Sequence, residues 1–151
     1  MSIVTAIRNI DRFKSDLEAL LKAAGELELA LLVETHGTAE VAKAFKLEDK
    51  GTSEEALKKL PKFNVSYEAW YSECFALLRQ LLPDRLQDFK EHFEVPRNRK
   101  VITYATYRIQ DALKGLRVTR QPYDEVVVDN KAAIPHFRQQ AAILLGCQAA
   151  I

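Results

Sequence analysis

Residues 63–116 read FNVSYEAWYSECFALLRQLLPDRLQDFKEHFEVPRNRKVITYATYRIQDALKGL, and they carry more information about the fold than any other part of the chain. Ser66 is able to cap a helix, and the residues after it place apolar side chains at helical spacing. Pro83 ends or kinks that helix, because the residue before a proline is pushed out of the α region. An aromatic stripe at helical spacing usually belongs to a core, so we expect this one to be buried. The apolar face comprises Tyr67, Trp70, Tyr71, Cys74, Phe75, Leu78, Leu81 and Leu82.

Two further helices are predicted in the same stretch. Asp84 can cap the first of them, and a charged loop follows at residues 95–100. Residues 103–113 then predict a helix, with Gly115 just past its end. The apolar residues of the helix after Asp84 are Leu86, Phe89 and Phe93.

The N-terminal half also predicts helices. Apolar residues recur at helical spacing from Ile3 to Gly25, where the glycine is either a stop or merely a break. Residues 26–35 alternate in part like a strand, but they are good helix formers and we favour helix. His36 beside Gly37 is typical of a helix end.

Two short helices are expected next, at residues 38–45 and 53–60, with Thr38 and Ser53 as their caps. Residues 46–52 form a polar connector between them.

The C-terminal part contains the one clear strand signal, residues 123–128. Such a strand is short, pairs with residues 118–119 as a hairpin, or pairs with another chain. Pro135 suits the first turn of a last helix. No charge follows Arg138, which suggests that the end of the chain is buried or forms a dimer contact. The sequence therefore predicts one mostly α-helical domain over residues 1–151, with about six helices and a short hairpin or strand near 118–128.

Composition narrows the functional class. The chain has 151 residues, of which 48% are hydrophobic and 28% charged, and its net charge of +1 argues against a generally basic nucleic-acid binder. The only cysteines, Cys74 and Cys147, have no metal-ligand spacing, so we expect no metal and no cofactor. Two cysteines without a secretory signal favour the cytoplasm. The sequence has no 18-residue apolar run, so we expect no membrane span.

Arg85 and His92 are the candidate catalytic pair. They lie seven residues apart, about two helical turns, and so share one helix face. In a metal-free ribonuclease, His takes the 2′-hydroxyl proton and Arg stabilises the charge on the phosphorane. Two turns separate the Cα atoms by roughly 10 Å, so convergence on one phosphate requires a dimer or a bent helix. The alternative is a solvated Arg and a half-buried His.

A basic segment is the second candidate site. Residues 79–120 contain ten Lys or Arg and five Asp or Glu, a net charge of +5, whereas the first 62 residues have a net charge of −1. Interleaved Tyr104 and Tyr107 could stack on bases while the cations contact phosphates. The other interpretation is a solvated face whose Arg side chains pair with local carboxylates. The nucleic-acid-binding candidates are Arg97, Arg99, Lys100, Tyr104, Arg108, Lys114, Arg117 and Arg120.

Residues 60–145 resemble the N-terminal region of a group of uncharacterised bacterial proteins. The resemblance rests on Tyr67-x-x-Trp70-Tyr71, on the LLPDR run at residues 81–85 and on Ala133-Ile134-Pro135. In that group a C-terminal helical domain of HEPN type follows, a class linked to toxin–antitoxin and phage-defence ribonucleases. The HEPN signature places a polar residue after its Arg, whereas this chain has Leu86 after Arg85. The resemblance thus implies the non-catalytic half of such a protein.

These observations lead to two functional hypotheses. The first is a non-enzymatic helical interaction or regulatory module, linked to toxin–antitoxin or phage-defence systems, that has a protein partner or forms a homo-oligomer. The second is an RNA-binding domain or weak metal-independent ribonuclease that uses the basic face at residues 79–120.

Overall fold

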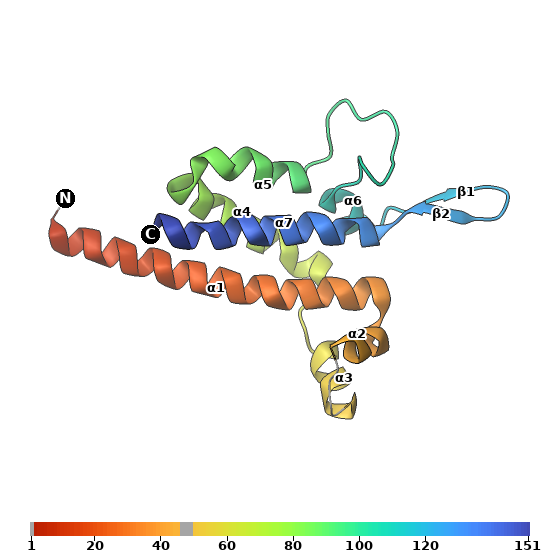
Figure 1. The fold of residues 1–151 in the computed structure, drawn as a ribbon, viewed down its shortest axis with the longest axis horizontal. Helices are drawn as coiled ribbons and strands as arrows, with labels where there is room; N and C mark the ends of the chain where they lie inside the picture. The colour runs from red at the N-terminus through yellow and green to blue at the C-terminus, as the bar shows by residue number, and fades with distance from the viewer. Residues whose placement is uncertain (1, 46–49) are drawn as a thin grey trace.

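Three long helices form the centre of the molecule. The structure is a computed structural model that describes residues 2–45 and 50–151. In these residues there are seven α-helices and one two-stranded antiparallel hairpin. Helices α1 (Ile3–His36), α4 (Phe63–Leu81) and α7 (Ala133–Leu145) pack along one another, and the other elements flank them (Figure 1). The predicted mostly α-helical fold with a short β-hairpin is confirmed.

Helix α1 is one continuous 34-residue helix, so the prediction of an end at Gly25 is wrong in its stronger form. A glycine inside a helix costs about 1 kcal/mol relative to alanine. Ala24 and Leu27 on either side of Gly25 are buried against the other helices, and this packing carries the helix through. The true end is Gly37, which has φ +88°, a conformation that favours glycine. The favoured helix at residues 26–35 and the helix end at His36 are both confirmed.

Two short helices, α2 (Thr38–Ala44) and α3 (Lys50–Lys58), pack beside the C-terminal part of α1 (Figure 1). Both were expected, with two differences. Gly37, not Thr38, is the N-cap of α2 and makes no side-chain hydrogen bond there. Helix α3 begins at Lys50, within the predicted connector, while residues 46–49 of that connector lie outside the described residues.

Helix α4 begins three residues before the predicted cap. Its N-cap is Lys62, so Ser66 lies inside the helix, and the Phe63 N–H donates to the Glu34 carboxylate at 3.0 Å. Pro83 ends α4 as predicted and opens a short 3₁₀ turn, Pro83–Arg85. Helix α5 (Leu86–Phe93) follows without a side-chain cap, so the prediction that Asp84 caps it is wrong.

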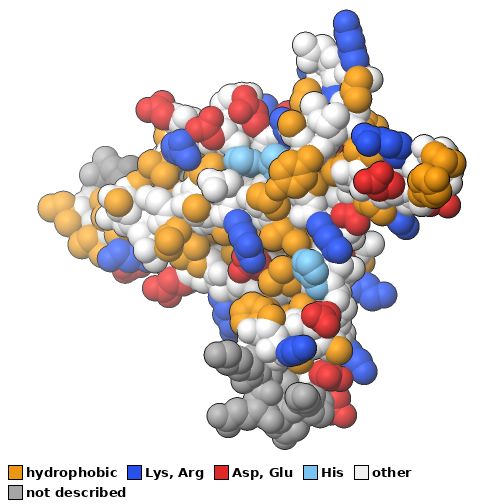
Figure 2. Space-filling model, turned by 45° about the vertical axis from the view of Figure 1, so that its right-hand side comes forward, with side chains coloured by type: hydrophobic (Ala, Val, Ile, Leu, Met, Phe, Trp, Pro, Cys, Tyr) orange, Lys and Arg blue, Asp and Glu red, His pale blue; other side chains and the backbone are white. Residues whose placement is uncertain are grey.

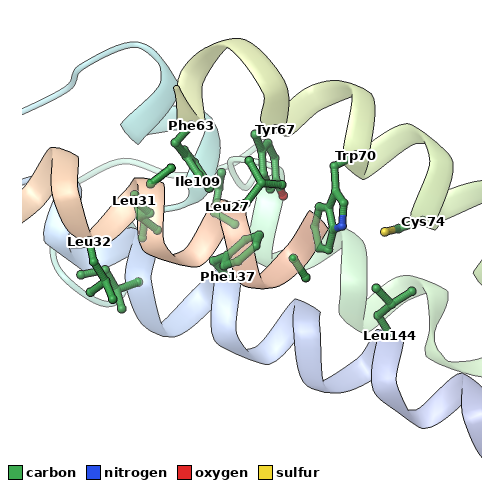
Figure 3. Packing of buried hydrophobic residues seen from close by; sticks show 14 of the residues in the cluster. Leu27, Leu31, Leu32, Phe63, Tyr67, Trp70, Cys74, Ile109, Phe137 and Leu144 are labelled. Carbon is green, nitrogen blue, oxygen red and sulfur yellow. The ribbon is translucent and has the colours of Figure 1, made fainter. Parts of the chain in front are cut away.

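The core is an aromatic cluster between α4, α5 and α7 (Figure 3). Tyr67 and Trp70 are buried, and the Trp70 indole N–H donates to the Leu20 carbonyl of α1 at 3.0 Å. The prediction that the stripe on α4 is core is confirmed at Tyr67, Trp70 and Cys74, whereas Tyr71 and Phe75 are half-buried. Phe137 of α7 packs edge-on against Phe63 at 5.5 Å between ring centroids.

One buried amide joins three helices. The Tyr67 hydroxyl donates to Gln140 Oε1 at 2.6 Å, and Gln140 Nε2 donates to the Phe89 carbonyl at 2.9 Å. Gln140 is on α7, Tyr67 on α4 and Phe89 on α5, and all three side chains are fully buried. A single polar side chain thereby satisfies its own donor and acceptor while tying the three helices together.

Residues 94–108 form an irregular loop, and this corrects the predicted helix at 103–113. Only α6 (Ile109–Leu113) is helical. Asp111 is 2% exposed and pairs with the Arg99 guanidinium through two hydrogen bonds, of 2.6 and 3.0 Å. The Thr106 hydroxyl donates to the Val101 carbonyl and accepts from the Thr103 N–H, each at 2.8 Å. These side chains bind the backbone groups that a helix would have used. Gly115 does lie just past the helix end, with φ +70°.

The strand at 123–128 pairs within the chain. Strands β1 (Val118–Arg120) and β2 (Glu125–Val128) form a hairpin that projects from one end of the molecule (Figure 1). A 3₁₀ turn, Asn130–Ala132, leads into α7, and Pro135 lies in its first turn as predicted. A last 3₁₀ turn, Gly146–Ala150, buries Cys147, and Ile151 packs against the core.

Candidate functional site

The N-terminal third of α1 exposes a row of large apolar side chains. Ser2 caps the helix by accepting the Thr5 N–H at 3.1 Å, so the helix is defined from its first turn. Hydrophobic side chains gather where α1 begins, at the left-hand end of the molecule in Figure 2. We call these residues the N-terminal stripe: Ile3, Val4, Ile7 and Ile10, which are 79%, 58%, 53% and 44% exposed.

The stripe is the start of a longer apolar row that is buried elsewhere. Positions spaced alternately by three and four residues run from Ile3 to Leu31, the spacing of a helix that packs lengthwise on another helix. From Leu17 onward these side chains are buried by the protein itself. Phe13, where the row enters the core, is half-buried. The sequence prediction treated the whole row as one face and did not separate its exposed start from its buried remainder. The members of the row are Ile3, Ala6, Ile10, Phe13, Leu17, Leu20, Ala24, Leu27 and Leu31.

An open groove continues from the stripe between α1 and α4. Its volume is about 520 Å³, and both charged and apolar side chains line it. Arg12, Phe13 and Asp16 form its side on α1, and Glu73 and Leu77 belong to its side on α4. The N-terminal part of α1 also carries Arg8 and Asp11, so charges of both signs surround the stripe.

The predicted basic face is divided by the structure. Arg97 and Lys100 are exposed in the loop 94–108. Arg117 and Arg120 are exposed on or beside the hairpin, and Lys114 follows α6. Lys and Arg side chains on the face shown in Figure 2 lie at separate places among acidic and hydrophobic ones. The cations therefore do not form one continuous field on that face.

Two of the predicted nucleic-acid-binding arginines have structural partners instead. Arg99 holds Asp111, with side-chain exposures of 13% and 3%, and also donates to the Thr106 carbonyl at 3.1 Å. Arg108 donates to the carbonyls of Ala105 and Tyr107.

The two tyrosines of the basic segment also differ. Tyr104 is 63% exposed and accessible to a base. Tyr107 is fully buried and donates its hydroxyl hydrogen to the Leu116 carbonyl at 2.9 Å, which removes it as a stacking residue.

Arg85 and His92 have different partners in the structure. Arg85 is exposed and pairs with Asp88 at 2.7 Å. His92 is half-buried, and its Nδ1 lies 2.8 Å from Nδ1 of His136, which belongs to α7. The sequence showed no partner for His136, because the contact joins residues 44 positions apart. Two histidine side chains adjoin each other on the face shown in Figure 2.

Both histidines of the pair disfavour protonation. Burial lowers the pKa of His136 to about 4, and the neighbouring His92 and Arg108 act in the same direction. A hydrogen bond to the Tyr107 carbonyl opposes this shift. Burial and Arg108 also lower the pKa of His92, against the carboxylates of Asp88 and Glu91. The pair is therefore neutral near pH 7, so that one ring donates to the other.

The remaining chemical groups are quickly placed. Cys74 and Cys147 are free and buried, and burial raises the pKa of both thiols, which makes them poor nucleophiles. Among the described residues, no three His, Cys, Asp or Glu side chains are grouped to hold a metal ion. None of the helices in the described ranges combines the length and apolarity needed to cross a bilayer.

Comparisons with protein-family models, with curated proteins and with solved structures find no match to this chain. The resemblance to HEPN-associated proteins therefore stays a prediction.

Proposed function

We propose that this protein is a non-enzymatic helical interaction module that binds another protein chain through the N-terminal stripe. One observation carries the proposal: four large apolar side chains at the start of α1 are at least 44% exposed, although the row they begin is core elsewhere. Most helix stability in proteins comes from packing an amphipathic face against a partner. The chain itself supplies that partner only from Leu17 onward.

The state of association in solution tests this function. We expect wild-type chains to associate with each other or with a co-purifying protein in size-exclusion chromatography with light scattering. Ile7→Glu places a charge in the middle of the stripe and should abolish that association. Val65→Glu is the matched control, because Val65 is 75% exposed on α4 and lies outside the stripe. A wild-type chain that stays monomeric and holds no protein would contradict the proposal.

RNA binding is the second candidate function, favoured by the exposed cations of the loop 94–108 beside Tyr104. Arg97→Ala combined with Lys100→Ala should weaken binding to single-stranded RNA, and should reduce the salt dependence by roughly 0.7 per lost phosphate contact. Arg99 is left intact, because its removal would strand the buried Asp111. Its nuclease form further requires that His92→Ala abolish cleavage.

The charge-matched control is Lys58→Ala with Lys59→Ala, which removes two cations near the end of α3. If both double variants bind alike, or if the wild-type chain does not bind at low salt, the RNA hypothesis is wrong.

A further inference from the structure

We infer that the partner of the N-terminal stripe is a second copy of this chain, bound antiparallel along the same segment of α1. This inference rests on the proposed function and goes beyond it by naming the partner and the geometry. The spacing of the row is the first support. Ile3, Ala6, Ile10 and Phe13 alternate by three and four residues, so they form a straight seam for a second helix of the same kind.

The charges around the stripe favour a second copy over other occupants. Arg8, Arg12 and Lys14 alternate with Asp11 and Asp16 along the same two turns. A helix that lies on an anionic membrane surface carries mainly Lys and Arg on its polar face. A surface with both signs is instead complementary to itself, because each copy offers acids and bases to the other.

The shape of the molecule decides the direction. The N-terminal end of α1 projects beyond the end of α7 and the C-terminus (Figure 1). From Leu17 onward the row is covered by the body of the protein. In a parallel pair the two bodies would compete for the same side of the seam. In an antiparallel pair they lie at opposite ends, and only the projecting segments overlap.

The seam then has a defined register. Ile3 of one copy lies opposite Phe13 of the other, and Ala6 of one copy lies opposite Ile10 of the other. Each end of the seam reaches Phe13, where the groove between α1 and α4 begins. The overlap from residue 3 to residue 13 is about 15 Å long, which is short for a stable interface. The pairing is therefore expected to depend on protein concentration.

Disulfide trapping of full-length chains tests the pairing. We expect a mixture of Ala6→Cys and Ile10→Cys chains to form the mixed disulfide, at least several-fold more than either variant forms with itself. Ile3→Cys chains should not cross-link to each other, since the two Ile3 positions lie about 15 Å apart along the seam. Val65→Cys serves as the exposed control. Cys74 and Cys147 are fully buried and do not compete.

The outcomes separate this inference from the proposed function. Mixed cross-linking together with a dimer mass that Ile7→Glu abolishes supports the antiparallel pair. Self-cross-linking of Ile3→Cys chains indicates a parallel pair and overturns the inference. A monomer that binds a different protein, and loses it in Ile7→Glu, also overturns the inference but leaves the proposed function standing. A monomer that binds only anionic vesicles overturns both.

Discussion

Asp111 shows how one buried carboxylate shapes a whole loop. Its oxygens accept from both Arg99 guanidinium nitrogens and from the Arg108 backbone N–H at 2.8 Å. A buried charge needs a partner and several hydrogen bonds to offset the loss of water. The loop 94–108 folds so as to supply them, and Arg99 becomes part of the scaffold. Sequence spacing alone does not reveal this, because Arg99 and Asp111 are twelve residues apart.

The histidine pair gives a prediction at the same scale. Both imidazoles have a pKa below the usual 6.5 in the folded protein, and that of His136 is about 4. The unfolded chain therefore binds more protons than the folded one between these pH values. Their contribution to stability is complete above pH 6.5 and is lost as the pH falls towards 4. The loss should be on the order of 1–2 kcal/mol, because the rings are partly exposed and solvent screens them.

Urea unfolding of wild-type and His136→Gln proteins across this pH range measures the effect. The variant should be less stable near pH 7 but lose less stability on acidification. His36→Gln is the control, because His36 is exposed at the end of α1. Parallel pH dependence in wild-type and His136→Gln proteins would show that the pair does not contribute.

Helix α1 is the element that departs most from the needs of a small domain. Its 34 residues extend about 50 Å, whereas a small domain measures about 30 Å across. Helix α4, with 19 residues, extends only about 28 Å along it. Part of α1 must therefore project, and its length is the sequence signal from which the exposed stripe could have been predicted.

Gly25 makes that helix testable. A Cβ added at this position meets nothing within 4 Å, and the residue is exposed inside a helix. Gly25→Ala should therefore raise the free energy of unfolding by up to about 1 kcal/mol, because alanine restricts the unfolded chain and favours helix. Chemical denaturation of the variant measures it.

Gly37→Ala is the matched comparison for that prediction. Gly37 also has open space around it, but its φ of +88° strains any side chain, so the variant should lose about 1 kcal/mol or more. If Gly25→Ala were destabilising as well, α1 would need flexibility at Gly25 that its geometry does not show.

At the scale of the whole molecule, the sequence predicted helices better than their ends. Periodicity located α4, α5 and α7, because each buries one face of regular spacing. The caps at Thr38, Ser66 and Asp84 were wrong, because backbone and tertiary contacts satisfy those helix starts instead.

The candidate sites were harder to predict from sequence. The basic residues were identified individually, but their exposure depends on contacts between distant residues such as Arg99 and Asp111. The His92–His136 contact required the packing of α5 on α7, which no local pattern encodes.

The buried amide of Gln140 has a consequence for uniqueness of the fold. Apolar faces of helices can slide past one another by a turn at modest cost, since many apolar contacts are interchangeable. Gln140 can satisfy both its oxygen and its nitrogen only where the Tyr67 hydroxyl and the Phe89 carbonyl lie on opposite sides of it. A shifted packing would leave the amide unsatisfied in the interior, at about 1–3 kcal/mol for each group. One polar side chain thus selects a single axial alignment of α4, α5 and α7 among the many that hydrophobic burial alone would accept.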